Sequence, residues 1–474
     1  ALRSACEKAG GELVTVEHNP LDAVWADRPT PPTGRIVAHD IAFAGESAES
    51  KLKRIGEALK KEGSDALLLT LADSIAWAFN IRGADVAHNP VALCYALVRR
   101  DGRATLLVDP RKIDETVRSH LDGLCDIVDE AGLGEVVAEL REKDITIQLD
   151  PASAADRFAR LLDGGKARVK HGTDPVILMK AVKNEAEIAG MRAAHIRDGV
   201  AMCRFLHWLD DHAESGKLDE ISAAKKLEEI RVSTNKLKDI SFDSISAAGP
   251  NGAMCHYRVN EISNRRIEPQ SLYLIDSGGQ YEDGTTDITR TIAVGQPTTE
   301  MRERFTLVLK GHIAIATARF PKGTSGAQID AFARRHLWDA GLDFDHGTGH
   351  GVGAYLSVHE GPQNISKRGV TPFEPGMIVS NEPGYYKEGE YGIRIENLVL
   401  VREGDKGGDG LAFLEFETLS FTPIDLDLVE PAVMTDDEIV WLNDYHAETR
   451  DKLMPLVHED DKAWLEQATR PISR

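Results

Sequence analysis

The chain has 474 residues, of which 42% are hydrophobic and 28% are charged, and its formal net charge is -21. This length exceeds what one compact core holds, so the sequence predicts two or three domains of an ordinary globular protein. The strong negative charge argues against nucleic acid or an anionic membrane as the main partner. No apolar run approaches the roughly 20 residues that a membrane-spanning helix needs, so we expect no membrane partner.

The cysteines and the opening stretch indicate the compartment. The five cysteines are scattered and form no Cys-x-x-Cys pair, which is typical of reduced thiols rather than of a disulfide framework. The opening stretch, "ALRSACEKAGGELVTV", lacks the basic start and apolar middle of a secretory signal. We therefore expect a cytoplasmic protein.

The N-terminal third of the chain predicts an α/β domain. Residues 1–40 begin without Met and contain the proline-rich linker "NPLDAVWADRPTPPTGR", so we expect that a segment has been removed upstream. Residues 41–172 then alternate helical and strand patterns, which predicts a mixed or parallel sheet. Helices are expected near 111–122, 133–142 and 153–163, and strands at "DALLLT", "YALVRR", "ATLLVD" and "ITIQLD".

Residues 173–430 predict a larger domain with an internal duplication. Asn184 and Glu187 have the spacing of a capping box, which starts a long helix. A shorter helix and strands follow, and the same cycle then runs a second time. Such a duplication brings two strand layers face to face, with the helices outside. The four helices are expected at about 185–211, 218–232, 299–319 and 325–341.

The C-terminal residues, 431–474, predict a helical extension. An acidic helix start lies near Thr435, and Trp441, Leu442 and Trp464 are expected to pack the extension onto the preceding domain. No residue pattern in this extension indicates chemistry.

Acidic residues lie where the cores of strands are expected. Asp276 directly follows the apolar run "LYLI", and Asp287 opens the strand-like run "DITRTIAV". Glu382 follows "MIVS" closely, and strand alternation in "YGIRIENLVLV" places Glu396 on one face with Arg394. Burying a carboxylate costs several kcal/mol unless it is paired, hydrogen-bonded or bound to a metal.

Histidines lie between these acids in the sequence. His346, His350 and His359 fall within "HGTGHGVGAYLSVHEGP". Taken singly, a strand-end acid is usually a solvated turn residue, and a lone histidine is more often hydrogen-bonded than a ligand. Those interpretations would all have to hold together, whereas four clustered carboxylates repel one another unless cations neutralise them. Four oxygen donors with one imidazole suit two divalent ions of the Mn, Co or Zn type.

The order of these residues resembles that of the pita-bread metallopeptidases, which include methionine aminopeptidase, prolidase, aminopeptidase P and creatinase. The stretches "YLIDSGGQYEDGTTDITRT", "HGTGHGVGAYLSVHEGP", "NEPGYYKEGEYGIRIEN" and "AWAFNIRGADVAHNPV" are similar to the cytosolic type of Xaa-Pro aminopeptidase. The resemblance implies α/β N-terminal domains followed by an α+β pita-bread catalytic domain of duplicated α-α-β units. Only the tail of a first N-terminal domain, within residues 1–40, is recognisable.

The resemblance implies a set of metal ligands. Asp287 and Glu396 would bridge two divalent cations, His350 and Glu382 would complete one coordination shell, and Asp276 would complete the other. The family resemblance favours Mn²⁺, while Co²⁺ and Zn²⁺ also suit these donors.

Four of the matching residues are implied to be catalytic. His256 would contact the substrate near the scissile bond and assist the leaving imino group. His346 and His359 match two further active-site histidines, and His359 would donate to the developing oxyanion. Glu382 would shuttle a proton in addition to binding metal.

Three further residues are implied to bind substrate. Arg394 and Tyr386 would shape a pocket for proline, and Arg82 lies in a loop expected to reach the active site. The implied activity is release of the N-terminal residue from peptides with proline in second position. We expect a hydroxide bridging the metals to attack the Xaa-Pro bond, in a homodimer.

Three alternatives stay open at this stage. Prolidase uses the same metals but accepts only Xaa-Pro dipeptides, and organophosphate hydrolysis would be a side activity of such a site. Pita-bread modules that bind histones or RNA have lost metal ligands, whereas all five ligand positions are kept here. The same observation disfavours metal-free creatinase chemistry.

Overall fold

The chain divides into two compact units. The computed structural model describes residues 2–14, 16 and 18–474. The units are Ala1–Thr33, which contains helices α1 (Leu2–Lys8) and α2 (Pro20–Val24), and Gly34–Arg474, which contains every other element.

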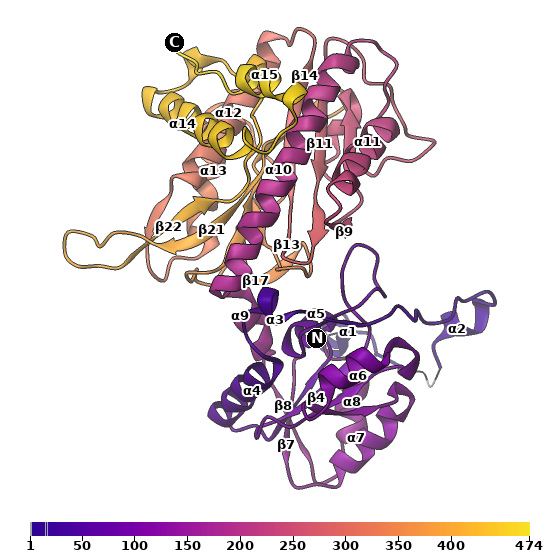
Figure 1. Ribbon diagram of the computed structural model, residues 1–474. Helices are drawn as coiled ribbons and strands as arrows, with labels where there is room; N and C mark the ends of the chain where they lie inside the picture. The colour runs from indigo at the N-terminus through magenta and orange to yellow at the C-terminus, as the bar shows by residue number, and fades with distance from the viewer. Residues whose placement is uncertain (1, 15, 17) are drawn as a thin grey trace. The chain divides into compact units, whose positions relative to one another are not determined.

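A six-stranded mixed sheet organises the first part of the second unit (Figure 1). Its order is β6-β5-β4-β2-β7-β8, with β4 antiparallel to both neighbours and the outer pairs parallel. The mixed sheet is one of the two arrangements that the sequence predicted. Its strands are β2 (Ala66–Leu69), β4 (Tyr95–Arg99), β5 (Ala104–Leu107), β6 (Cys125–Val128), β7 (Thr146–Leu149) and β8 (Arg168–His171).

The two edge strands, β6 and β8, were missed by the sequence analysis. Their sequences, "CDIV" and "RVKH", are short and partly charged, and their side chains are half-buried or exposed. Charged edge strands are common because they prevent pairing with other chains, but they carry little apolar signal.

The three helices predicted for this part of the chain are present as α6, α7 and α8. The remaining elements of this part are β1 (Val37–Ala38), β3 (Ile81–Arg82), α3 (Ile41–Ala44), α4 (Ala48–Glu62), α5 (Ala72–Ala78), α6 (Glu115–Leu121), α7 (Leu133–Arg141), α8 (Asp156–Leu162) and α9 (Pro175–Ala181).

The predicted α-α-strand cycle occurs twice in the following residues. The first long helix starts with the predicted capping box, in which the Asn184 side chain accepts from the Glu187 N–H and the Glu187 carboxylate accepts from the Asn184 N–H. Each long helix is followed by a shorter one and then by strands, and in the second cycle a three-residue strand also separates the two helices. The helices are α10 (Glu185–Ala213), α11 (Glu220–Ser233), α12 (Thr299–Ala316) and α13 (Gly326–Asp339).

Two sheets supply the strand layers of this domain (Figure 1). One has the order β10-β11-β14 and the other β15-β22-β21-β18-β16-β17, while β9, β12 and β13 form a smaller sheet and β19 and β20 a hairpin. The strands are β9 (Leu237–Ile240), β10 (Ile245–Ala248), β11 (Ser271–Ser277), β12 (Gly279–Tyr281), β13 (Gly284–Thr285), β14 (Ile288–Val294), β15 (Arg319–Pro321), β16 (Gly349–Gly351), β17 (Glu360–Ile365), β18 (Ile378–Asn381), β19 (Gly384–Lys387), β20 (Tyr391–Arg394), β21 (Asn397–Glu403) and β22 (Phe413–Thr418).

The C-terminal extension packs on this domain through two helices, α14 (Asp436–Leu453) and α15 (Glu459–Ala468). Thr435 caps α14 with a capping box of its own, and Leu442 is fully buried in the main apolar cluster of the domain. Trp441 and Trp464 pack against the same cluster as partly buried side chains. These three side chains contact the apolar cluster as expected, while the extension as a separate domain stays a prediction.

The predicted domain boundaries at residues 40, 172 and 430 stay predictions, because the structure separates only the first 33 residues as a compact unit of their own. Among the helices of the described residues, none combines the length and apolarity needed to cross a bilayer.

A buried histidine in α14 predicts a loss of stability in acid. The Nε2 atom of His446 accepts a hydrogen bond of 3.0 Å from the Ile424 N–H, so the ring is neutral. Burial, with the charges of Arg290 and Arg450, lowers the pKa of His446 to about 3. The unfolded chain, with an ordinary histidine pKa near 6.5, takes up the proton first as the pH falls. This contribution to stability is complete above about pH 6.5 and is lost towards about pH 3.

We therefore expect His446→Gln, which keeps an acceptor but cannot titrate, to lose less stability than the unchanged protein between pH 7.5 and pH 5. The difference should be about 2 kcal/mol, from unfolding midpoints in urea at the two pH values. His18→Gln, at an exposed histidine, is the control and should behave as the unchanged protein does. Equal acid sensitivity of His446→Gln and the control would contradict the prediction.

Candidate metal centre

Two buried carboxylates come from the three-stranded sheet. Asp276 lies in β11 and pairs in antiparallel register with Thr289 of β14, while Asp287 directly precedes β14. Asp276 is 7% exposed and Asp287 is 3% exposed. The antiparallel register therefore brings two acids that are eleven residues apart in sequence to one face of this sheet.

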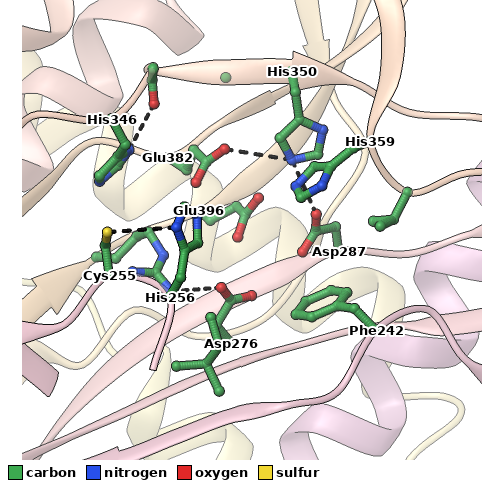
Figure 2. Close-up of a pocket in the computed structure, with 15 residues that line it drawn as sticks. Phe242, Cys255, His256, Asp276, Asp287, His346, His350, His359, Glu382 and Glu396 are labelled. Carbon is green, nitrogen blue, oxygen red and sulfur yellow. Dashed lines mark hydrogen bonds and ion pairs between the residues drawn. The ribbon is translucent and has the colours of Figure 1, made fainter. Parts of the chain in front are cut away.

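The other donors come from three neighbouring strands, β16, β18 and β21, of the six-stranded sheet in the catalytic domain. His350 lies in β16, Glu382 directly follows β18, and Glu396 directly precedes β21. Because β18 lies between β16 and β21, the three side chains reach the same place. Figure 2 shows Glu396 at the centre of the group, with Glu382 and His350 above it in this view and Asp276 below.

All five predicted ligands line one cavity of about 380 Å³ (Figure 2). Predicted His256, His346, His359 and Arg394 line it as well. Six lining residues were not predicted, namely Phe242, Ile245, Cys255, Gly347, Gly349 and Val358. The apolar members among them carry no chemical signal in the sequence, and only the fold brings them to the acids.

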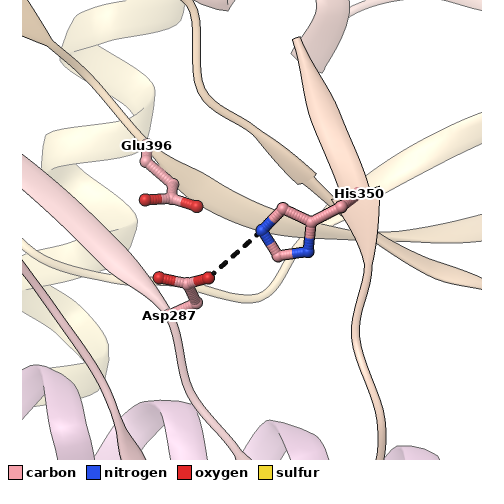
Figure 3. A group of neighbouring side chains, drawn as sticks. All are labelled: Asp287, His350 and Glu396. Atoms are coloured by element: carbon pink, nitrogen blue, oxygen red, sulfur yellow. Dashed lines mark ion pairs between the residues drawn. The ribbon is translucent and has the colours of Figure 1, made fainter. Parts of the chain in front are cut away.

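The tightest group of donors is Asp287, His350 and Glu396 (Figure 3). One donor atom from each lies within 4.8 Å of the other two. The Nε2 atom of His350 is 3.4 Å from Asp287 Oδ2 and 3.5 Å from Glu382 Oε1. These separations leave room for a cation between the donors.

The other ring nitrogen of His350 fixes its tautomer. Nδ1 lies 2.9 Å from the Gly351 carbonyl oxygen, which can only accept, so Nδ1 carries a hydrogen. Nε2 then directs its lone pair at two carboxylates, which is unfavourable unless a proton or a metal ion lies between them. The arrangement therefore fits a metal-ligating histidine.

Three of the four carboxylates are each oriented by one donor from the protein. Thr289 Oγ1 donates to Glu396 Oε2 at 2.7 Å, and Ser380 Oγ donates to Glu382 Oε1 at 3.0 Å. Arg394 Nη2 donates to Asp276 Oδ2 at 2.6 Å. Asp276 Oδ1 is buried and has no hydrogen-bond partner among the described residues. A buried carboxylate oxygen without a hydrogen-bond partner is costly, and binding a cation would satisfy it.

The acids of the cation-free site hold protons strongly. Burial and the neighbouring negative charges raise the pKa of Asp287 to about 6 and that of Glu382 to about 7. The same causes raise the pKa of Glu396 well above its usual range. Burial alone would lower the pKa of His350, but the adjacent carboxylates raise it to about 9. The site therefore has a deficit of positive charge, which divalent cations would supply.

The Tyr386 hydroxyl is hydrogen-bonded to two residues of the cavity wall, His346 and Arg394. It lies 2.7 Å from His346 Nε2 and accepts from Arg394 Nη1 at 2.8 Å. His346 Nδ1 donates to the Gly347 carbonyl at 2.8 Å, so both ring nitrogens are engaged. Burial and the charge of Arg394 lower the pKa of His346 to about 4, so the ring is neutral. Tyr386 is not among the residues that line the cavity, and it orients His346 and Arg394 instead.

His359 and His256 face the cavity with their rings available. Burial, with the charges of His350 and His256, lowers the pKa of His359 to about 4, and its ring centroid lies 4.2 Å from that of His350. Among the described residues, no hydrogen bond is made by the His359 ring, and His256 has only a contact of 3.8 Å with Cys255 Sγ. Both rings can therefore donate to a molecule in the cavity.

Arg82 lies away from the metal cavity, and its expected role in substrate binding stays a prediction. Arg82 is 3% exposed and does not line the cavity. Its guanidinium donates to the carbonyls of Tyr355 and Ala354 in the catalytic domain and to those of Ala76 and Ile81 beside it. Four of its five N–H groups are therefore engaged with backbone carbonyls away from the cavity.

Comparison with known proteins decides the family. A model of the creatinase/prolidase N-terminal domain matches residues 27–187, one of metallopeptidase family M24 matches 189–403, and one of the C-terminal region of that peptidase family matches 412–472. A curated protein of Aspergillus fumigatus, "Probable Xaa-Pro aminopeptidase P", is 41% identical across 100% of this chain and 75% of its own length. The chain belongs to metallopeptidase family M24.

Solved structures of this family agree with that assignment. The X-prolyl aminopeptidase of Caenorhabditis elegans, described as a cytosolic enzyme with a di-nuclear active site, superposes with a TM-score of 0.93 and 35% identity over 99% of this chain and 78% of its own. The prolidase of Pyrococcus horikoshii superposes with a TM-score of 0.62 and 26% identity over 80% of this chain and 99% of its own. The predicted pita-bread fold and the resemblance to Xaa-Pro aminopeptidases are confirmed.

The hydroxyl of Tyr386 provides a test of this geometry. Tyr386→Phe leaves a buried Arg394 N–H without its acceptor and His346 Nε2 without its donor, which should cost about 1–3 kcal/mol of unfolding free energy. Tyr385→Phe is the matched control on the same strand, because the Tyr385 hydroxyl makes no hydrogen bond among the described residues and its loss should cost less than about 0.5 kcal/mol. Unfolding midpoints of the metal-free variants measure both. Equal losses would contradict the assigned hydrogen bonds.

Proposed function

We propose that this member of family M24 is an Xaa-Pro aminopeptidase, which releases the N-terminal residue from peptides with proline in second position. The observation that carries the proposal is the cavity in which three buried carboxylates, the half-buried Glu382, His350 and three further histidines converge. Similarity to a protein named Xaa-Pro aminopeptidase P over the full length of the chain supports this choice of activity within the family.

Five residues would hold two divalent cations. The central position of Asp287 and Glu396 supports them as the ligands shared by both ions. His350 and Glu382 would complete one shell, and Asp276, through its unpartnered Oδ1, the other. When bound, the cations supply Lewis acidity and a nucleophilic water at neutral pH.

The remaining steps fall to the residues of the chain. Neutral His359 donates to the carbonyl oxygen of the scissile bond as negative charge develops on it. Glu382, whose second oxygen is not held by Ser380, takes up and returns the proton of the attacking water. His256, at the cavity wall, donates to the imino nitrogen of proline as that group leaves.

A proline in second position changes what the cavity must accept. Proline has a fixed φ and leaves an imino nitrogen without an amide hydrogen, so ordinary aminopeptidases process this bond poorly. Arg394, fixed by Asp276, Tyr386 and Thr289, forms a rigid part of the wall. The apolar side chains of Phe242, Ile245 and Val358 offer contacts for a ring or an aliphatic side chain.

The finer assignments are part of the same proposal. Mn²⁺ is the proposed metal, because a site of four carboxylates and one imidazole suits it, as it also suits Co²⁺ and Zn²⁺. A cytoplasmic location is supported by the description of the nematode structure as a cytosolic enzyme and by the absence of cysteine pairing among the described residues. A homodimer is proposed from the family resemblance alone.

A competition between two substrates tests the activity. The enzyme, supplemented with Mn²⁺, receives an Xaa-Pro-Pro tripeptide and the matching Xaa-Pro dipeptide together, and mass spectrometry follows the products. Chelator-sensitive release of the first residue from the tripeptide, at least tenfold faster than from the dipeptide, is the expected result. Cleavage of the dipeptide alone would identify a prolidase instead. Cleavage of neither, by protein with two bound ions, would favour a non-catalytic binding role.

The shared-ligand assignment of Asp287 predicts a second outcome. Asp287→Asn should abolish turnover and lower bound metal below two ions per chain, because the amide removes one negative donor from both shells. Metal content by mass spectrometry and tripeptide cleavage measure the change. Asp283→Asn, at a partly buried ion pair with Arg197 in the same segment, is the control and should leave metal content unchanged. Near-normal turnover of Asp287→Asn would make the assignment wrong.

A further inference from the structure

The segment that carries His359 is irregular and connects two strands. We define the histidine loop as residues 352–359, between β16 and β17. His359 and Val358 from this loop line the metal cavity. Unlike His350, whose position is set by a strand, His359 depends on the backbone of the loop for its place in the cavity.

The N-terminal domain holds the middle of the histidine loop through Arg82. The Nε atom of Arg82 donates to the Tyr355 carbonyl at 2.5 Å, and Nη2 donates to the Ala354 carbonyl at 3.2 Å. Nη1 donates to the carbonyls of Ala76 and Ile81, at 3.3 and 2.9 Å, so the guanidinium is anchored in its own domain. Its planar set of donors therefore links the two domains at one buried point.

Tyr355 has a backbone conformation that needs this support. Its φ is +52°, a left-handed value that is unfavourable for a bulky residue and persists only where surrounding contacts enforce it. The carbonyl of the same residue accepts from Arg82, and the Arg82 Cζ lies 5.6 Å from the centroid of the Tyr355 ring. The ring of His39, also in the N-terminal domain, lies 5.8 Å from that ring.

The next two loop residues are also held from the N-terminal domain. Leu356 is 1% exposed and belongs to the apolar cluster of that domain. Its carbonyl accepts from Gln280 Nε2 at 2.8 Å, and the same Nε2 donates to the His88 carbonyl at 3.1 Å. Asn89 Nδ2 donates to Ser357 Oγ at 3.0 Å. The loop is therefore bound by the N-terminal domain directly up to the residue before Val358.

A buried ion-pair network holds the residue after His359. Glu360 is paired with Lys183 at 2.5 Å and with Lys180 at 3.0 Å. Lys180 also pairs with Asp73 of the N-terminal domain at 3.0 Å. Breaking one partner of such a buried network is costly, so the network is expected to be rigid. His359 thus lies between two anchored points.

We propose that the N-terminal domain is part of the catalytic apparatus and that Arg82 is a positioning residue, which places His359 in the cavity through the carbonyls of Tyr355 and Ala354. The inference rests on the proposed role of His359 as a donor to the substrate. A misplacement of about 1 Å in such a donor can lower turnover by about 100-fold. Loss of Arg82 releases the strained Tyr355, and the loop that carries His359 relaxes.

A double-mutant cycle tests whether Arg82 acts through His359. The four proteins are the unchanged enzyme, Arg82→Met, His359→Gln and the double variant, each loaded with Mn²⁺ and given the proline-second tripeptide. We expect Arg82→Met to lower kcat at least tenfold, with KM changed less than threefold and the metal content unchanged. The double variant should lose no more than His359→Gln alone, because Arg82 has no further effect once its target is gone.

A matched control separates positioning from a general loss of stability. Lys51 is a buried cation of the same domain, whose Nζ donates to the Trp77 carbonyl and to Asn80 Oδ1 and makes no hydrogen bond to the histidine loop. Lys51→Met should change kcat of the folded protein less than twofold, and any loss should multiply with that of His359→Gln. If Arg82→Met gives insoluble protein, Arg82→Lys, which keeps the charge but not the planar fork, enters the same cycle.

Three outcomes would overturn the inference. Losses that multiply in the Arg82–His359 cycle would show that Arg82 acts independently of His359, while the proposed function would stand. A kcat of the Arg82 variant within twofold of the unchanged enzyme would show that Arg82 does not position His359, and the proposed function would again stand. If His359→Gln itself leaves kcat unchanged, the proposed role of His359 fails and the positioning role falls with it.

Discussion

Mutual repulsion among four carboxylates in one cavity is the constraint on which the rest of the catalytic domain depends. Asp276, Asp287, Glu382 and Glu396 are brought together from two sheets, and their full or partial burial makes each negative charge costly. Arg394 is the one arginine or lysine among the residues that line the described cavity, and it is engaged with Asp276. The protein therefore orients one oxygen of three of these groups with its own donors and leaves the remaining charge to be neutralised by bound cations.

This constraint explains why the ligands were visible in the sequence. An acid beside an apolar strand run, as at Asp276 or Glu382, breaks a local pattern, and four such breaks are hard to explain singly. The capping box at Asn184 was equally local, because both partners lie within one turn. Features of this kind need no knowledge of the fold, so the donor set and the helix start could be read directly.

Other features depend on contacts between distant residues and could not be read. Nothing in "NIRGADV" indicates that two acceptors of Arg82 lie about 270 residues further on, so the sequence did not show that this arginine is buried between distant segments. The adjacent Tyr385 and Tyr386 are indistinguishable in sequence, yet only Tyr386 bonds to His346 and Arg394. Phe242 and Ile245 reach the cavity only because β10 pairs with β11. Tertiary contact, and not local pattern, decides each of these cases.

The ligand set alone does not separate the activities found on this fold. Proteins named prolidase share the family and superpose on about four fifths of this chain, whereas the nematode X-prolyl aminopeptidase superposes on nearly all of it. Cations held by the same residue types would supply the same chemistry in both, so selectivity for peptide length must come from surfaces beyond the ligands. In this chain the N-terminal domain contacts the loop that carries His359, so a change in that domain can shift a residue of the cavity wall without altering any of the five proposed ligands. Differences in substrate between members of the family are therefore best sought where the N-terminal domain meets the catalytic domain.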